Sequence, residues 1–230
     1  MAFYFVSTFA NAQTPTKQRP YGYRGLKIIT SLRLPFPDFQ RMNFLQQNTK
    51  YLTIFALALL MALTRSDHFG SAITLPDASL AVFYLAGIFT GGVLSFVVLL
   101  TEAALLDYIA ITHWQVSDYC ISPAYVFLIP TYAIMLLAGK WSAKYTSLNS
   151  RDLSRQLMYL LVAGSIAFLI SNGSFYLLSG KFPELSVVEY MQRVAKYYPA
   201  YISSTLIYSL AILLFSKLVF ALYQEKYKTA

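Results

Sequence analysis

The chain has 230 residues, of which 57% are hydrophobic and only 12% are charged, about half the charged fraction of a soluble globular domain. Its formal net charge of +8 does not indicate a nucleic-acid partner, because the basic residues stand at the ends of apolar segments rather than on one polar face. A single cysteine excludes an intrachain disulfide. We therefore expect an all-α integral membrane protein.

The N-terminal part of the chain differs in composition from the rest. Residues 1–41 contain prolines and arginines without a clear helical period, so we expect a basic, disordered extension there. Residues 42–230 are predicted to form the membrane domain. Because Met42 directly precedes this domain, we expect a chain that starts there to insert and function.

Six charge-poor segments follow in chain order and predict six membrane helices. They are residues 49–64, 76–90, 92–111, 122–139, 157–178 and 199–222. If residues 78–111 formed one straight helix it would be about 51 Å long, against a hydrocarbon core of about 30 Å. We therefore expect this stretch to break at Gly91-Gly92, where the backbone is least restricted.

The distribution of Lys and Arg tests this break and orients the helices. With six crossings and a cytoplasmic N-terminus, 14 of the 18 basic residues fall on the inner side and four on the outer side. If the second and third helices were merged, the split would be 10 to 8. The positive-inside rule therefore predicts six crossings with both termini in the cytoplasm.

Small residues four apart occur in the first two predicted helices. They are the pairs Ala58 and Ala62, and Gly87 and Gly91. Such pairs permit close contact between membrane helices, although they are frequent and carry little specificity.

Three outer segments meet on one face under this topology, namely residues 65–77, 112–121 and 179–198. They and the adjoining helix ends carry most of the residues able to do chemistry: His68, Asp107, His113, Asp118, Cys120, Tyr125 and Arg193. An ionisable residue inside a membrane helix is costly unless it faces a cavity or a partner, so Asp107 is a candidate site residue. Each histidine, taken by itself, is better explained as a solvated loop residue than as a site residue.

Cys120 is the candidate for reactivity. It lies just before Ser122-Pro123, a pattern typical of a helix start, and the positive end of a helix dipole favours the thiolate form. The thiolate attacks electrophiles and binds soft metals. Composition by itself also allows an inert, buried thiol.

Two further residues are pocket candidates from topology. Asn172 lies in the outer half of the fifth helix, where its amide either lines a site or joins helices by hydrogen bonds. Tyr197 belongs to a group of tyrosines near the outer start of the sixth helix. Such a group forms either an interfacial aromatic belt or the wall of a pocket for a large amphipathic ligand.

Three sequences on the outer side carry a resemblance. Arg65-Ser-Asp-His-Phe-Gly, Leu75-Pro-Asp-Ala-Ser-Leu and Ser117-Asp-Tyr-Cys-Ile-Ser-Pro-Ala-Tyr125 resemble the BtuM-type cobalamin uptake proteins. That family is similar in fold to the substrate-binding S-components of energy-coupling-factor transporters, and acts without a dedicated ATPase module. The resemblance covers residues 42–222 and is most specific around Cys120.

The resemblance implies a cobalamin site on the outer face of a bacterial inner-membrane protein. The family's pocket is lined by residues matching His68, Asp107, Cys120, Tyr125 and Arg193. The cysteine sulfur ligates cobalt and the cyano ligand of cyanocobalamin is lost, which makes Cys120 the metal ligand and the residue for decyanation. A soft thiolate suits this role, because only the axial positions of cobalt in a corrin are open.

Two other functions remain open at this stage. A thiol-dependent membrane enzyme would use Cys120 as nucleophile and His68 or His113 as base. A structural membrane protein would need none of these residues. Cobalamin and membrane lipid are the expected partners, and a shared energy-coupling module is a further candidate that the resemblance does not require.

Overall fold

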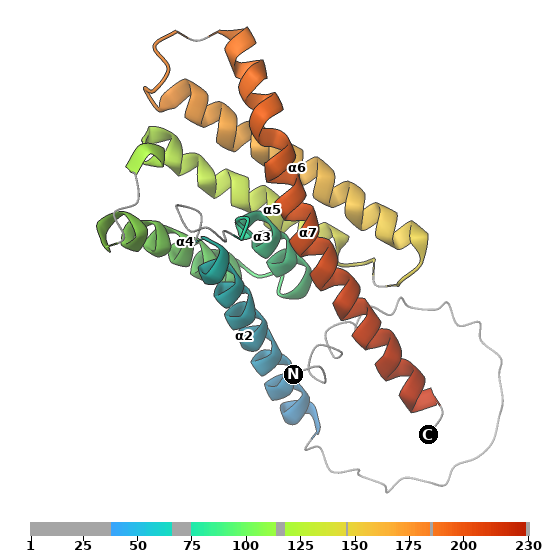
Figure 1. The fold of residues 1–230 in the computed structure, drawn as a ribbon. Helices are drawn as coiled ribbons and strands as arrows, with labels where there is room; N and C mark the ends of the chain where they lie inside the picture. Colours follow the sequence, from blue (N-terminus) through green and yellow to red (C-terminus); the bar gives the residue numbers. More distant parts are fainter. Residues whose placement is uncertain (1–37, 66–74, 114–117, 146, 185, 229–230) are drawn as a thin grey trace, which may run out of the picture.

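The computed structural model describes residues 38–65, 75–113, 118–145, 147–184 and 186–228, and every regular element in this part of the chain is helical (Figure 1). The elements in chain order are α2 (Asp38–Arg65), α3 (Ser79–Phe89), α4 (Val93–His113), η2 (Asp118–Cys120), η3 (Pro123–Phe127), α5 (Leu128–Ser142), α6 (Ser150–Leu178) and α7 (Val187–Lys228). The predicted all-α class is confirmed. Most of residues 1–41 and all of residues 66–74, including His68, lie outside the described residues.

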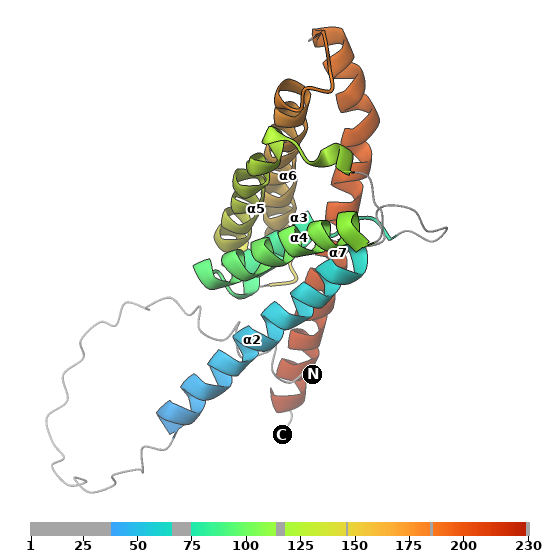
Figure 2. The same ribbon diagram turned by 90° about the vertical axis from the view of Figure 1, so that its left-hand side faces the viewer.

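Four of the described helices are long and apolar enough to cross a membrane. They are residues 93–113, 123–142, 150–178 and 187–222, and α3 is a shorter apolar helix beside them. These helices are compatible with a multi-pass membrane protein. In Figure 2 the axis of α4 runs at a steep angle to that of α7.

The predicted break at Gly91-Gly92 is confirmed. The helix α3 ends at Phe89 and α4 begins at Val93. Gly91 between them has a φ of 58°, a left-handed conformation that glycine adopts without the steric cost a side chain would add. Thr90 supports the turn, because its Oγ1 lies 2.8 Å from the Oγ of Ser95.

The short helix α3 is the centre of the core, since all of its residues are buried. It packs against α5 with the two backbones in direct contact. A Cβ on Gly87 would collide with the carbonyl oxygen of Leu136, and a Cβ on Gly139 would collide with that of Tyr84. Gly87 therefore serves close packing as its spacing suggested, but its partner is Gly139, whereas Gly91 belongs to the turn.

Three helix boundaries differ from the sequence prediction. The first helix begins at Asp38, within the predicted extension, and α6 begins at Ser150 rather than near residue 157. The largest difference is α7, which starts at Val187 and runs for 42 residues through Pro199. The segment 187–198 was expected to be part of an outer connection and is instead the first three turns of this helix, so Arg193 and Tyr197 are helical residues.

Candidate functional site

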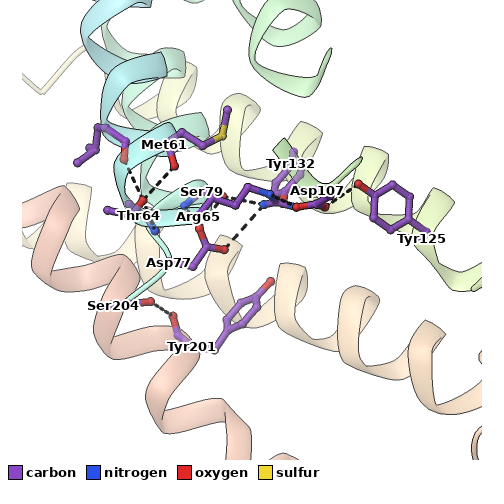
Figure 3. A network of polar contacts seen from close by, with 12 residues as sticks. Met61, Thr64, Arg65, Asp77, Ser79, Asp107, Tyr125, Tyr132, Tyr201 and Ser204 are labelled. Carbon is purple, nitrogen blue, oxygen red and sulfur yellow. Dashed lines mark hydrogen bonds and ion pairs between the residues drawn. The ribbon is translucent and has the colours of Figure 1, made fainter. Parts of the chain in front are cut away.

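A polar network forms where the end of α2 meets α3, α4 and α5 (Figure 3). Arg65, the last residue of α2, donates from Nε to Oδ1 of Asp107 at 2.7 Å and from Nη2 to Oδ2 at 2.6 Å. This two-pronged geometry is the strongest form of an arginine–carboxylate pair. The Nη1 group donates to the hydroxyls of Ser79 and Tyr132, each at 2.9 Å.

A second carboxylate joins this network from the segment before α3. Asp77 Oδ1 accepts hydrogen bonds from the backbone N–H and the hydroxyl of Ser79, at 2.9 and 2.6 Å. Its Oδ2 lies 3.9 Å from Nη1 of Arg65. Thr64 Oγ1 accepts from the backbone N–H of Ala78 at 3.3 Å, so the end of α2 and the start of α3 are tied together.

Two of the predicted site residues meet in this network. Tyr125, on η3, donates its hydroxyl hydrogen to Oδ2 of Asp107 at 2.7 Å (Figure 3). Both oxygens of Asp107 therefore have hydrogen-bond donors, from Arg65 and Tyr125. The structure thus brings Asp107 and Tyr125 together in a closed network that holds η3 against α4.

The other group of predicted residues lies around Arg193 on α7. Its guanidinium carbon is 4.4 Å from the ring centre of Phe182, 5.2 Å from that of Tyr197 and 5.9 Å from that of Phe175. Aromatic faces attract a guanidinium electrostatically and leave its N–H groups free to bind other partners in the ring plane. The Nε of Arg193 is buried and has no hydrogen-bond partner among the described residues.

Tyr176 fixes the connection between α6 and α7 beside this group. Its hydroxyl accepts a hydrogen bond from the backbone N–H of Ser186 at 2.8 Å and lies 3.3 Å from Oε2 of Glu189. Its ring packs against Phe182 and Tyr190, with ring centres 4.7 and 5.3 Å away. We call the rings of Tyr119, Phe175, Tyr176, Phe182, Tyr190 and Tyr197, together with Arg193, the aromatic cluster.

The segment that carries Cys120 lies against this cluster. Cys120 is the last residue of the short helix η2, and its neighbour Tyr119 packs on Phe175 with ring centres 5.7 Å apart. Phe175 also contacts Arg193, so one ring separates the Cys120 segment from the guanidinium. The side chain of Cys120 lies outside the described residues.

The helix start predicted after Cys120 is confirmed, but the first helix there is a short 3-10 helix. Ser122 is the N-cap residue and Pro123 the first residue of η3, a five-residue 3-10 helix that leads directly into α5. The Ser122 hydroxyl makes no capping hydrogen bond. It is buried and finds no partner within the part of the chain that the structure describes.

Asn172 and Tyr197, which topology suggested, differ in their surroundings. Oδ1 of Asn172 is buried without a hydrogen-bond partner among the described residues. Next to it, Gly173 approaches the hydroxyl of Tyr190, which would lie 3.3 Å from an added Cβ. Tyr197 is 41% exposed and contacts Arg193. No hydrogen bond to Oδ1 in the described region supports the interpretation of Asn172 as a residue that joins helices.

Sequence reasoning missed Arg65, Tyr132 and the phenylalanines of the aromatic cluster. Arg65 was counted only as one of the outer basic residues. The available signal was that Arg65 and Asp107, of opposite charge, lie near the ends of two apolar segments, on the same side of the membrane in the predicted topology. Opposite charges at matching depths in two membrane helices are expected to pair.

Comparison of the sequence with protein-family models and with curated proteins finds no match.

Proposed function

We propose that this chain is a membrane transporter that binds cobalamin on its outer face, with the Cys120 thiolate as a ligand of cobalt. The observation that carries the proposal is the aromatic cluster beside the Cys120 segment, in which Arg193 Nε has no partner among the described residues. A corrin is a large, partly apolar ring with amide side chains, and a pocket for it needs apolar walls with a few unsatisfied polar groups. Asn172 and Arg193 are such groups, and Phe175, Phe182 and Tyr197 are such walls.

Asp107 and Tyr125 act differently in this proposal. Because Arg65 and Tyr125 donate to both oxygens of Asp107, these residues hold η3 and thereby set the position of the Cys120 segment that precedes it. They are positioning residues rather than direct ligands. His68 keeps the role that the family resemblance gives it, as a residue lining the pocket.

Removal of cyanide is a ligand exchange in this scheme. The lone pair of the thiolate forms the cobalt–sulfur bond, and the cobalt–carbon bond breaks with its electron pair leaving on cyanide. The oxidation state of cobalt does not change, and cyanide takes up a proton from water. Arg193 is positioned in the cluster to favour the anionic thiolate by charge.

The mechanism is tested by Cys120→Ser, which keeps the size of the side chain and removes the soft ligand. Purified with cobalamin, the wild-type protein should stay red, show a sulfur-to-cobalt absorption band and convert cyanocobalamin. The variant should lose the band and the conversion, while affinity falls only in part because the corrin contacts need no thiol. A variant with an unchanged spectrum and undiminished conversion would disprove the ligation.

The same experiment separates the alternatives. A thiol-dependent enzyme would instead form a stable covalent adduct with an organic substrate at Cys120, and bound cobalamin would not protect the thiol from alkylation. A purely structural membrane protein would bind no cobalamin, whether or not the aromatic cluster is intact.

We further propose six crossings of a bacterial inner membrane, with both termini cytoplasmic and α2 and α3 completing the four long apolar helices. The charge distribution supports this topology. A reporter enzyme that is active only in the cytoplasm, fused after Ala230, should be active. Activity of a periplasmic reporter at that position would refute the six-crossing arrangement. A shared energy-coupling module remains a candidate partner, tested by co-purification.

A further inference from the structure

A groove of about 490 Å³ lies at the end of the molecule opposite to the aromatic cluster. It runs between the first half of the described part of α2 and the turn that joins α3 to α4. Its lining residues are Gln47, Lys50, Tyr51, Ile54, Thr90, Gly92, Leu94 and Ser95. None of them belongs to the proposed cobalamin site, and the groove opens toward the inner leaflet in the proposed topology.

The polar part of this groove is positively charged. Lys50 is exposed and lines it, and the described lining residues include no acidic side chain. Lys140 brings a second cationic side chain to the turn. Its Cγ would lie 4.0 Å from a Cβ placed on Gly91. The hydroxyls of Thr90 and Ser95 already donate to the carbonyl oxygens of Ala86 and Gly92, each at 2.7 Å, so the polar contribution comes from the lysines and Gln47. The Gln47 amide donates one hydrogen to the hydroxyl of Tyr51 at 3.3 Å and has a second one to donate. This combination suits a phosphate group.

The groove continues into two exposed apolar stripes, one on each helix. On α2, Tyr51 of the groove is followed at four-residue intervals by Phe55 and Leu59, which are 64% and 50% exposed. On α4, Leu94 of the groove is followed by Val98, four residues later. Residues four apart share a helix face, so both stripes lead from the charged end toward the middle of the apolar helices. The groove is therefore amphipathic along its length.

We propose that this groove binds one anionic phospholipid of the inner leaflet. The phosphate lies against Lys50 with Lys140 nearby, and the acyl chains follow the stripes that begin at Tyr51 and Leu94. A soluble anion would need the charge but not the stripes, and a neutral lipid would need the stripes but not the charge. Basic residues near the inner membrane surface attract anionic headgroups in this way.

The test uses the full chain, purified in detergent and stripped of lipid, with phosphatidylglycerol and phosphatidylcholine of identical chains as probes. Native mass spectrometry should show one phosphatidylglycerol retained, preferred over phosphatidylcholine by roughly fivefold for each cation engaged. Lys50→Gln should lower this preference by about that factor. Lys144→Gln, an exposed inner-side cation outside the groove, is the matched control and should leave it unchanged.

A second variant blocks the groove without changing its charge. At Gly92 an added Cβ meets nothing closer than 3.7 Å and the backbone is not left-handed, so Gly92→Leu is compatible with the turn and fills the space. Its elution volume and thermal unfolding should match those of the wild type, and it should lose the retained lipid.

Four results would overturn the proposal: equal retention of the two lipids, an equal loss in Lys144→Gln, undiminished retention in Gly92→Leu, or displacement of the lipid by millimolar glycerol phosphate. The last result would show a site for a soluble anion. The placement in the inner leaflet rests on the proposed topology. Cobalamin binding should be unaffected by all three variants, so failure of the lipid proposal can be told apart from failure of the cobalamin proposal.

Discussion

The Arg65 network and the aromatic cluster each surround one arginine, and they differ in how far its hydrogen-bonding capacity is used. Arg65 donates to Asp107, Ser79 and Tyr132, and the two carboxylates near it balance its charge. Arg193 is surrounded by aromatic rings, and its buried Nε has no partner among the described residues. The first arginine is satisfied by the protein itself, whereas the second retains capacity for a ligand.

This difference separates the predicted site residues into two kinds. A buried polar group without a partner costs free energy, so a protein that keeps one gains something from it, such as a ligand that completes it. Asp107 and Tyr125 belong to the satisfied network and should matter for folding. Arg193 and Asn172 belong to the unsatisfied region and should matter for binding.

The largest effect is expected from Arg65→Met. The variant leaves the mostly buried carboxylate of Asp107 without its cation, and breaking a buried pair in this way costs up to about 3–5 kcal/mol. Denaturant or thermal unfolding in detergent measures the loss. Replacing both partners, in Arg65→Met with Asp107→Leu, should recover much of it, because the remaining carboxylate, Asp77, is one-third exposed and keeps its hydrogen bonds from Ser79.

One result for Arg65→Met would contradict this prediction. If Arg65→Met unfolded at the same temperature as the wild type but lost cobalamin binding, Arg65 would be a ligand-binding residue. The distinction between the two arginines would then fail.

Arg193→Met should give the reverse pattern. Its cation–π contacts are those of a half-buried arginine and are worth about 1 kcal/mol, so the unfolding free energy should change by no more than that. Cobalamin affinity, measured by isothermal titration calorimetry or by retained colour, should fall by about tenfold or more, as expected when a charged hydrogen-bond donor is lost. Lys196→Met removes a cation three residues away, beside Tyr197, and is the matched control.

The smallest effect on stability is expected from Asn172→Leu. The variant removes a buried oxygen that has no partner among the described residues, so the unfolding free energy should stay equal or rise by about 1 kcal/mol. Affinity for cobalamin should drop severalfold in equilibrium binding. A clear loss of stability with unchanged affinity would mean that Asn172 joins helices after all.

Local features of the fold could be predicted from the sequence, and features that join distant segments could not. The break at Gly91 follows from length and from the conformational freedom of glycine, both of which are visible locally. The packing partner of Gly87 could not be predicted from local sequence, because Gly139 lies 52 positions later and helix packing decides which small residues meet. The full length of α7 was also missed, since Arg193 and Lys196 look like residues of a connection although the helix continues through them.

The sequence predicted which residues belong to the candidate site, but not that they form two separate groups. Sequence grouped Asp107, Tyr125 and Arg193 on one outer face. The structure connects Asp107 with Tyr125 through Arg65, a contact across 42 positions, and connects Arg193 with rings whose roles no short pattern reveals. Whether a polar atom is left without a partner depends on the whole packing, so the distinction between the two groups required coordinates.

The short buried helix α3 also constrains the order in which the helices can assemble during synthesis. With 11 residues it is about 16 Å long, roughly half of the hydrocarbon core, so lipid cannot hold it across the bilayer. The surface that holds it is the backbone of α5, which is synthesised some 40 residues later. A ribosome-bound nascent chain that ends before α5 should therefore leave α3 accessible to water-soluble reagents, and α3 should become protected only when α5 has left the ribosome.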